Sequence, residues 1–423
     1  MLADPTIVMK FGGTSVAGAE DIKRAARRIV ARKQEGKRVV AVLSARGHTT
    51  DELIRAAEEV SPTPDPRELD MLLSTGERIS CALCAMAIND LGYKAISLTG
   101  SQAGIVTDTS HTKARILDVR ADRIVEALEQ GMIVLVAGFQ GVSTSRDVTT
   151  LGRGGSDTTA VAVAAALGAE VCEIYTDVNG VYSADPRIVP DARKLAQVSY
   201  EEIMEMAASG AKVLQLRSVE YARMHGVRIH CRSSFEDGPG TVVIGEDQTM
   251  EHPLITAVTH SIEEARITLI GVPDRPGAAA LIFTALADAG VNVDTIVQND
   301  PRSERASAEV TFTVALEDLR VAQSVLEPVI AELGITQVLA DPEVGKVSII
   351  GAGMRSHPGV AAKVFQVMGD AGVNIEIIHT SPIKITCLIR ADAVPDVVRA
   401  LHGAFDLGAG EVKPEAPFGQ EPR

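Results

Sequence analysis

Short apolar runs alternate with helical patterns through the first half of the chain. Four of these runs have the length and the β-branched composition of buried strands, namely residues 6–9, 39–43, 133–137 and 171–175. Residues 20–33 instead have the pattern of a helix. Strands separated by helices predict an α/β fold with a central, mainly parallel sheet. Because ligands in such folds bind beyond the carboxyl ends of strands, the glycine segments at 12–13 and 138–141 are candidate ligand loops.

The second half of the chain repeats one pattern. Each copy has an apolar strand, a Pro-Gly pair, a helix and the triplet Gly-Val-Asn, first at residues 266–294 and again at 346–376. The interval from Pro-Gly to Gly-Val-Asn is the same in both copies, so we predict two small βαβ-type units, each too small to be a catalytic domain. Turn-rich polar stretches at 233–240 and 245–253 are the expected junction between the two halves.

The segment with the clearest sign of a ligand-binding function is Leu-Gly-Arg-Gly-Gly-Ser-Asp-Thr-Thr-Ala at residues 151–160. It leads into an alanine-rich helix pattern at 160–169. Glycines and a helix N-terminus offer backbone N–H groups to an anion. Arg153 adds a planar fork that suits a carboxylate or a phosphate. Asp157, however, is an acid where an anion is expected to bind. The combination indicates a site that handles an anion through a cation or a charged amino group.

Two more segments each allow two interpretations. Lys10 lies in Lys-Phe-Gly-Gly-Thr-Ser at a strand-to-helix turn. Walker spacing is absent, but a lysine in such a turn can reach the phosphates of a nucleotide; the alternative is an exposed lysine before a tight turn. Residues 175–187 are either a plain loop of turn formers or a loop beside a nucleotide, with Tyr182 near the base and Arg187 near phosphate. Lys212 lies in a helix-like segment, where solvent exposure is the default.

Composition narrows the class of protein. The 423 residues predict two or three domains, and 46% hydrophobic with 23% charged residues is typical of a globular protein. A formal net charge of −15 and an aromatic content of 3% without tryptophan argue against a nucleic-acid partner. Apolar runs are shorter than a membrane span and the N-terminus lacks the pattern of a signal peptide, so we expect a cytoplasmic protein with no membrane partner.

The five cysteines are scattered, which fits a reducing compartment. Cys81 and Cys84 form a Cys-x-x-Cys pair inside an apolar helix pattern. Since no second pair or nearby histidine completes a zinc site, we expect them to be buried core residues. No metal-binding side chains are predicted.

Together these segments resemble the amino-acid kinase superfamily, and within it the aspartate kinases, over nearly the whole chain. The motifs occur in the family's order: KFGGTS at 10–15, SARGHTTD at 44–51, GERIS at 76–80, GFQG at 138–141, TLGRGGSDTTA at 150–160, YTDVNGVYSADPR at 175–187 and GAKVL at 210–214. The repeats are similar to the paired ACT modules of that family. The resemblance implies an α/β amino-acid kinase sandwich at 1–248 and two ferredoxin-like α+β ACT regions at 249–340 and 341–423.

The resemblance also implies transfer of the γ-phosphoryl group of ATP to the side-chain carboxylate of L-aspartate, with Mg²⁺ bridging the phosphates. The product, 4-phospho-L-aspartate, opens the synthesis of lysine, threonine and methionine. The implied catalytic residues are Lys10, Arg153, Asp157 and Lys212. The implied nucleotide neighbours are Lys10, Gly12, Gly13, Thr176, Asp177, Tyr182, Arg187 and Lys212. The implied substrate neighbours are Ser44, Thr50, Glu77, Arg153 and Ser156.

ACT modules imply feedback regulation by a small amino acid, here lysine, threonine or both, bound across a dimer of the modules. The implied effector contacts are Asp274, Gly277, Asn292, Asp294 and Gln298 in the first copy, and Asn374, Ile375 and Ser381 in the second. The assembly would be a homo-oligomer, or an α2β2 complex with a short ACT-only subunit started at Met250. Pro382 departs from the family pattern near the effector contacts, and Arg46 and His48 depart from it near the substrate.

Two rival functions remain at this stage. The first is another kinase of the superfamily, acting on glutamate, acetylglutamate or a nucleoside monophosphate; the tandem repeat and the GERIS segment argue against it. The second is a non-catalytic amino-acid sensor with a decayed kinase domain, which the intact Lys10, Arg153, Asp157 and Lys212 argue against.

Overall fold

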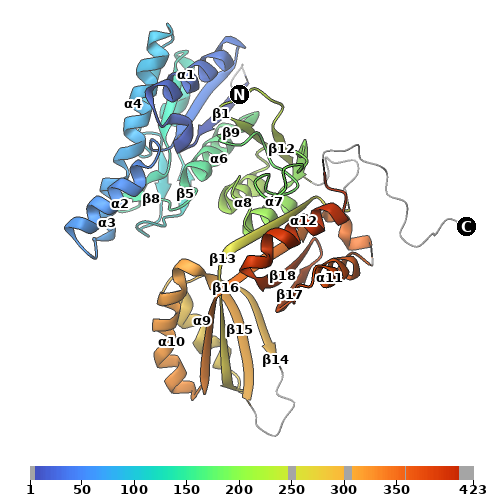
Figure 1. Ribbon diagram of the computed structural model, residues 1–423. Coiled ribbons are helices and arrows are strands. Elements are labelled where there is room, and N and C mark those ends of the chain that lie inside the picture. Colours follow the sequence, from blue (N-terminus) through green and yellow to red (C-terminus); the bar gives the residue numbers. More distant parts are fainter. Residues whose placement is uncertain (1–4, 246–253, 300–306, 358, 409–423) are drawn as a thin grey trace, which may run out of the picture. The chain divides into compact units, whose positions relative to one another are not determined.

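A computed structural model describes residues 5–245, 254–299, 307–357 and 359–408. The chain forms two compact units (Figure 1). The first, here called the sheet unit, comprises residues 1–181, 194–208 and 212–251. The second, here called the repeat unit, comprises 182–193, 209–211 and 252–423. Two short segments that precede the repeats in sequence therefore belong to the repeat unit.

The sheet unit is built on an eight-stranded sheet in the order β10-β12-β11-β9-β1-β2-β6-β3. Its strands are β1 (Thr6–Phe11), β2 (Arg38–Leu43), β3 (Ala95–Leu98), β6 (Ile133–Ala137), β9 (Val171–Thr176), β10 (Gln197–Ser199), β11 (Ile229–Ser233) and β12 (Thr241–Ile244). All neighbours pair in parallel except β11 and β12. The four strands predicted from apolar runs are confirmed as β1, β2, β6 and β9. Their near-continuous apolar sequences fit burial on both faces.

Helices cover both faces of this sheet (Figure 1). On one face α1 (Ala19–Gln34) and α4 (Thr75–Asp90) pack against alternate strand residues such as Met9 and Phe11. On the other face lies α6 (Gly155–Leu167), whose residues are buried through Ala164. A helix that is apolar on all sides is typical of a core position. The remaining helices of the unit are η1 (Gly13–Val16), α2 (Thr49–Val60), α3 (Pro66–Leu73), α5 (Asp122–Glu129), α7 (Tyr200–Ala208) and α8 (Leu216–His225).

A second, four-stranded sheet in the order β5-β4-β7-β8 completes the sheet unit. Its strands are β4 (Ile105–Thr107), β5 (Ile116–Val119), β7 (Gln140–Ser143) and β8 (Val148–Thr150). Strand β8 ends directly before the glycine-rich segment, so this small sheet determines where that segment starts.

One helical stretch, Pro66–Asp90, has the length and apolar composition of a membrane span, which the sequence prediction overlooked. Half of its most apolar window is buried inside the protein, and the stretch is divided into α3 and α4 at Ser74. Cys81 and Cys84, as expected, are buried core residues of α4. The stretch is therefore explained as a core helix of the sheet unit.

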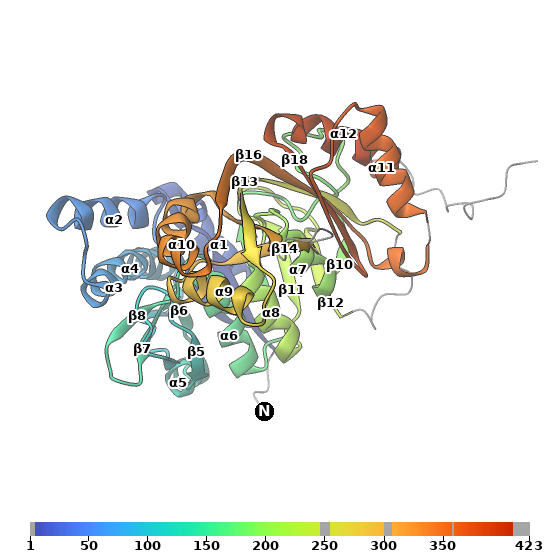
Figure 2. The same cartoon turned by 90° about the horizontal axis from the view of Figure 1, so that it is seen from below.

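The repeat unit has one antiparallel six-stranded sheet in the order β14-β15-β13-β16-β18-β17. The strands are β13 (Ala257–Pro273), β14 (Val293–Asn299), β15 (Ser307–Ala315), β16 (Gln337–Ile350), β17 (Ile377–Ser381) and β18 (Lys384–Arg390). Helices α9 (Ala278–Asp288) and α10 (Leu319–Leu333) pack side by side, as do α11 (Val360–Asp370) and α12 (Val394–Ala404) (Figure 2). Short η3 (Leu316–Asp318), η4 (Ala352–Ser356) and η5 (Ala391–Ala393) complete it.

The two predicted repeats are confirmed as two modules, but they are not simply consecutive. The first module is the continuous stretch 264–341. The second combines residues 257–261 of β13 with residues 344–405, because the start of β13 pairs with the end of β16. The long strands β13 and β16 thus pass through both modules and make one sheet of them.

Reciprocal ion pairs join the modules. The Arg266 guanidinium lies 2.6 Å from the Glu376 carboxylate, and the Lys346 ammonium lies 2.7 Å from that of Asp294. Arg266 and Lys346 occupy the same position in the two repeats, and so do Asp294 and Glu376. Each module therefore supplies a cation to the acid that follows Gly-Val-Asn in the other, as an internal two-fold repeat requires.

Candidate functional site

The carboxyl ends of four neighbouring strands form the floor of the candidate site. Backbone hydrogen bonds join these ends: Gly12 N to Tyr175 O at 3.4 Å, Ser44 N to Phe11 O at 3.1 Å and Gly138 N to Leu43 O at 3.0 Å. Both glycine segments therefore lie at the carboxyl ends of strands, as predicted, and their binding of a ligand stays a prediction. Parallel strands place all of these ends on one edge of the sheet.

Lys10 and Asp157 form the most enclosed charged pair of the site. The Lys10 Nζ lies 2.6 Å from the Asp157 carboxylate, and the two side chains are only 12% and 7% exposed. Lys10 lies on β1 and points away from α1, since Met9 and Phe11 face that side. Asp157 lies in the first turn of α6, where a carboxylate is favoured by the helix dipole. The pair fixes a lysine ammonium beside the glycine-rich segment.

The glycine-rich segment turns sharply into α6. Gly152 and Gly154 have φ of +76° and +72°, a left-handed conformation that favours glycine. A side chain at Gly155 would collide with Phe139 and Leu151, so that position also requires glycine. Helix α6 begins five residues before the predicted start, and Asp157 is therefore a helical residue. Arg153, between the two left-handed glycines, is exposed.

Glu77 is a buried acid at the start of α4. The residue is only 2% exposed. Its Oε1 accepts a hydrogen bond from the backbone N–H of Ala45 at 3.2 Å. Within the described residues Oε2 has no hydrogen-bond partner. Burial raises the pKa of Glu77 to about 7, against the opposing effect of backbone N–H groups and Arg78. A buried carboxylate oxygen without a partner is costly, and a cationic ligand group would relieve that cost.

The other predicted substrate residues lie at the end of a strand and at the starts of two helices. Ser44 follows β2 directly, Thr50 lies in the first turn of α2, and Ser156 is buried in the first turn of α6. The carbonyl of Ala17 accepts two hydrogen bonds from the Arg46 guanidinium. The unexpected positive charge of Arg46 is thus held against the backbone.

The predicted nucleotide residues fall into two groups. Lys10, Gly12 and Gly13 lie at the end of β1, and Thr176 ends β9, its neighbour in the sheet, with Asp177 directly after it. Tyr182 and Arg187 belong instead to the repeat unit, where Tyr182 packs against the core of the second module. The Arg187 guanidinium, 88% exposed, lies 2.7 Å from the Asp185 carboxylate. Their place beside ATP stays a prediction.

Two sequence predictions about local structure are wrong. Lys212 lies in an irregular connection between α7 and α8, not in a helix. The segment 233–240 is the turn of the antiparallel hairpin β11–β12 within the sheet unit, not a junction between domains. The boundary between the units falls in the other predicted stretch, 245–253, whose residues from 246 on lie outside the described part of the chain. Turn-forming composition is the same for a hairpin loop and a linker, which explains the second error.

The predicted effector residues lie on corresponding elements of the two modules. Asp274 and Gly277 precede α9, and Asn292, Asp294 and Gln298 lie at and along β14. In the second module Asn374 and Ile375 precede β17, and Ser381 ends it beside the exposed Pro382. Met250 lies outside the described residues.

Asp294 already holds a cation. Its carboxylate and that of Glu264 lie 2.7 and 2.8 Å from the buried Lys346 ammonium. Burial raises the pKa of Asp294, but the charge and hydrogen bond of Lys346, the Thr295 N–H and the charge of Lys384 together outweigh burial, so the net pKa is lowered. An effector ammonium at Asp294 would therefore share this carboxylate with Lys346.

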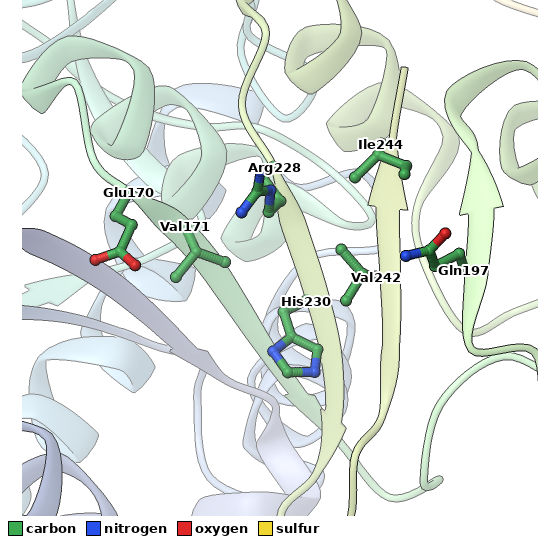
Figure 3. Close-up of a pocket in the computed structure, with 7 residues that line it drawn as sticks. All are labelled: Glu170, Val171, Gln197, Arg228, His230, Val242 and Ile244. Carbon is green, nitrogen blue, oxygen red and sulfur yellow. The ribbon is translucent and has the colours of Figure 1, made fainter. Parts of the chain in front are cut away.

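A cavity of about 470 Å³ lies elsewhere on the sheet unit (Figure 3). Glu170, Val171, Arg228 and His230 line it at the amino ends of β9 and β11. That is the opposite end of the strands from Gly12 and Thr176. Among the described residues that line it, no buried polar side-chain atom lacks a partner, and the cavity is separate from the candidate site.

Known proteins are similar to the chain over nearly its whole length. Residues 5–233 match the amino acid kinase family, and residues 266–334 and 347–405 each match the ACT domain. The chain is 56% identical to the aspartokinase of Mycobacterium tuberculosis H37Rv, over 96% of this chain and 97% of that protein. It is 53% identical to the aspartokinase of Corynebacterium glutamicum, over 95% and 96%. The crystal structure of E. coli aspartokinase III in complex with aspartate and ADP is similar with a TM-score of 0.81 and 26% identity, over 94% of this chain and 99% of that one.

Proposed function

The chain belongs to the aspartokinase family and is an aspartate kinase, and from that premise we propose how its residues move the γ-phosphoryl group of ATP to the side-chain carboxylate of L-aspartate. That carboxylate is ionised at neutral pH, so its attack needs no general base. The barrier is the approach of one anion to another, through a loose transition state with charge on the γ-phosphoryl oxygens. Catalysis then consists of neutralising charge and aligning the reactants.

The observation that carries the proposal is the enclosed Lys10–Asp157 pair next to the glycine-rich segment. We assign Lys10 to the transferring phosphoryl group, with Asp157 orienting its ammonium. Gly12 leaves the space beside the Lys10 ammonium open to the phosphates, since an added Cβ would lie 3.5 Å from Nζ. Gly13 is required by packing, because a Cβ there would lie 3.0 Å from the carbonyl oxygens of Ala45 and Gly47. Lys212 is assigned to the outer phosphates on the strength of the family motif.

We assign the two ends of the amino-acid substrate to Arg153 and Glu77. The guanidinium of Arg153 would take a carboxylate in two parallel hydrogen bonds. Oε2 of Glu77, which lacks a partner among the described residues, would take the α-ammonium group. Ser44, Thr50 and Ser156 would orient the bound molecule.

Mg²⁺ would accompany ATP. Among the described residues no three His, Cys, Asp or Glu side chains converge on a possible metal position. We therefore place the ion on the phosphates of the nucleotide, which is the usual way for Mg²⁺ to bind in kinases. When bound it would neutralise phosphate charge, while Lys10 holds its own position through Asp157.

A panel of small acids tests the substrate assignment. We expect ATP turnover to depend on L-aspartate and to be at background with glutamate, acetylglutamate or a nucleoside monophosphate. Turnover with one of those acceptors instead would support the rival kinases, and no turnover with any acceptor would support a non-catalytic sensor.

Aspartate binding should depend on pH through Glu77. An ammonium group binds the ionised form of Glu77, and with a pKa of about 7 that form is lost as pH falls through 7. The KM for aspartate should therefore rise about tenfold between pH 8 and pH 6, while the KM for ATP stays constant. Initial rates across this range measure both constants.

Glu77→Gln is the matched control for this effect, because it keeps the shape of the side chain and removes the titration. Its KM for aspartate should be raised and independent of pH. The unfolded chain loses the Glu77 proton near pH 4.5 and the native chain near 7, so between these values the stability of the wild type falls as pH rises. Glu77→Gln should lack that decline, which is about 3 kcal/mol. A pH-dependent KM in Glu77→Gln would refute the assignment.

Regulation by lysine, threonine or both is proposed from the two ACT modules. Gln298→Ala or Asp274→Ala should abolish inhibition of the kinase by these amino acids, because each removes a polar contact proposed for the effector. The measurement is the inhibitor concentration that halves aspartate-dependent turnover, with lysine and threonine added separately and together. Unchanged inhibition in both variants would show that the effector binds elsewhere.

The remaining proposals follow from the family. We infer that the product feeds lysine, threonine and methionine synthesis, and that the protein works in the cytoplasm. The assembly is proposed to be a homo-oligomer through the modules, or an α2β2 complex with an ACT-only chain begun at Met250.

A further inference from the structure

The start of the glycine-rich segment is fastened by two charged residues far from it in sequence. Asp70 on α3 and Arg217 on α8 each bridge the same two pieces of chain. One piece is the loop at 110–114 between β4 and β5, and the other is Thr150–Leu151 at the end of β8. None of the sequence motifs drew attention to these two residues.

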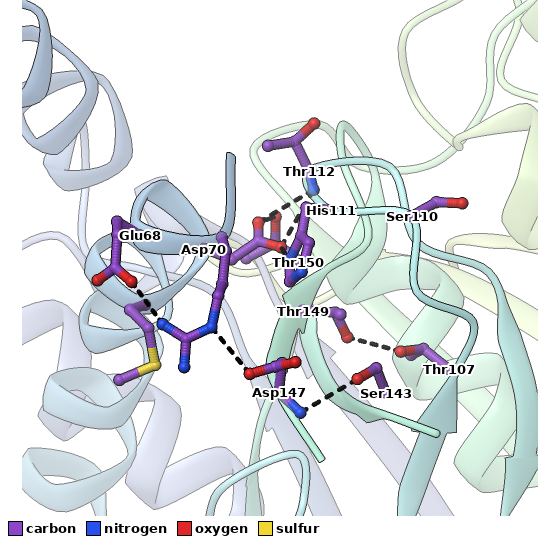
Figure 4. Close-up of polar contacts among 12 residues, drawn as sticks. Glu68, Asp70, Thr107, Ser110, His111, Thr112, Ser143, Asp147, Thr149 and Thr150 are labelled. Carbon is purple, nitrogen blue, oxygen red and sulfur yellow. Dashed lines mark hydrogen bonds and ion pairs between the residues drawn. The ribbon is translucent and has the colours of Figure 1, made fainter. Parts of the chain in front are cut away.

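Asp70 provides the acidic half of the fastening. Its side chain is 0% exposed. The carboxylate accepts hydrogen bonds from the Thr150 hydroxyl at 2.5 Å and from the Thr112 N–H at 3.1 Å, and its second oxygen lies 2.7 Å from His111 Nδ1 (Figure 4). Figure 4 shows these groups converging on Asp70 from both pieces of chain. A buried carboxylate with several donors is firmly held, because each hydrogen bond to an ionised group is strong.

Arg217 provides the basic half. One Nη donates to the Leu151 carbonyl at 2.9 Å, and the other donates to the Ala114 carbonyl at 2.8 Å. The planar fork of a guanidinium fits two acceptors at once, which a lysine ammonium cannot reproduce. The Ala114 N–H also donates to the Thr150 carbonyl at 2.9 Å. The loop at 110–114 and the end of β8 are therefore also hydrogen-bonded to each other directly.

The loop at 110–114 is in close contact with the glycine-rich segment. Thr112 has a φ of +66°, a conformation that is unfavourable for a β-branched residue, and its N–H is held by both oxygens of Asp70. The carbonyl of Thr112 faces Gly152, where an added Cβ would lie 3.2 Å from it. Arg153 follows directly. The backbone that leads into Arg153 is thus held at the two residues directly before it, Leu151 and Gly152.

We propose that Asp70 and Arg217 are positioning residues for the kinase reaction, which set the place of Arg153 and thereby its hold on a substrate carboxylate. The proposal rests on the assignment of Arg153 under the proposed function. The hydrogen bonds described for Asp70 and Arg217 lead to the segment before Arg153 and not to Lys10, Gly12 or Gly13. We therefore expect a larger effect on aspartate than on ATP.

Arg217→Lys tests the proposal first. It keeps the charge and loses the two-pronged contact, so the KM for aspartate should rise about tenfold while the KM for ATP stays within about twofold, since small displacements of a positioning group are costly. Arg120→Lys, at an exposed arginine paired with Asp118, is the matched control and should behave as the wild type. Equal increases in both KM values would mean a general structural defect and would overturn the proposal.

A double-mutant cycle with Arg153 separates positioning from general stability. If Arg217 acts through Arg153, Arg217→Lys should cause no further loss of aspartate affinity in the Arg153→Ala background. Additive losses would overturn the proposal. Absence of aspartate-dependent turnover in the wild type would instead refute the proposed function, so the two failures are distinguishable.

A matched pair at Thr150 covers the case in which Arg217→Lys fails to fold. Thr150→Val removes the hydroxyl that donates a hydrogen bond to Asp70. It should raise the KM for aspartate several-fold and leave the KM for ATP unchanged. Thr150→Ser keeps the hydroxyl and should recover most of the lost affinity. Equal KM values for aspartate in Thr150→Val and the wild type would contradict the role of Asp70.

Discussion

Lys10→Met should lower kcat about 1,000-fold, because it removes the cation assigned to the transferring phosphoryl group. The ammonium of Lys10 is held 2.6 Å from the Asp157 carboxylate in a nearly enclosed position, which fixes its charge at that point. The effect should be on kcat more than on either KM, since the interaction is strongest in the transition state. Steady-state rates at saturating ATP and aspartate measure it.

Loss of folding must be separated from loss of chemistry in this variant. Lys10→Met leaves Asp157 buried without its cation, which should reduce the free energy of unfolding by about 3 kcal/mol. The double variant Lys10→Met/Asp157→Asn removes both charges and should recover most of that stability without recovering turnover. A kcat within tenfold of the wild type in either variant would refute the role of Lys10.

Arg153→Ala should raise the KM for aspartate about 100-fold and the KM for ATP no more than about threefold, because it removes a two-pronged, charge-assisted contact to one substrate only. Arg153 lies between two left-handed glycines and at the N-terminus of α6, so its removal leaves the buried core untouched. The two KM values, measured with the other substrate saturating, decide the prediction.

Two further variants calibrate the result at Arg153. Arg153→Lys keeps the charge and loses the fork, and its KM for aspartate should lie between those of Arg153→Ala and the wild type. Arg123→Ala, at an exposed position of α5, should leave both KM values unchanged. If Arg153→Ala raises the KM for ATP as much as the KM for aspartate, the guanidinium binds the nucleotide and the substrate assignment is wrong.

The strands of the sheet could be predicted because their signal is local. The apolar runs of β1, β2, β6 and β9 identify buried strands wherever they lie in the fold, and glycines after two of them mark the ligand edge. The start of α6 could not be predicted, because consecutive glycines have low helix propensity. Packing on all sides overrides that propensity, and Asp157 becomes a helical partner of Lys10.

Contacts between distant segments explain what the sequence did not reveal. Asp70 reaches Thr150 across 80 positions, and Arg217 reaches Leu151 and Ala114 across 66 and 103. No spacing rule connects such residues. The same holds for the second module, whose first strand, residues 257–261, precedes the entire first module in the chain.

The most direct test of the account is the identity of the product. The chain is incubated with ATP, Mg²⁺, L-aspartate and hydroxylamine, which converts an acyl phosphate to a hydroxamate and releases phosphate. We predict one aspartate side-chain hydroxamate, identified by mass spectrometry, for each ADP formed, and formation of both products about 1,000-fold slower in Lys10→Met. ADP formed from ATP without any aspartate hydroxamate would contradict phosphoryl transfer to the side-chain carboxylate.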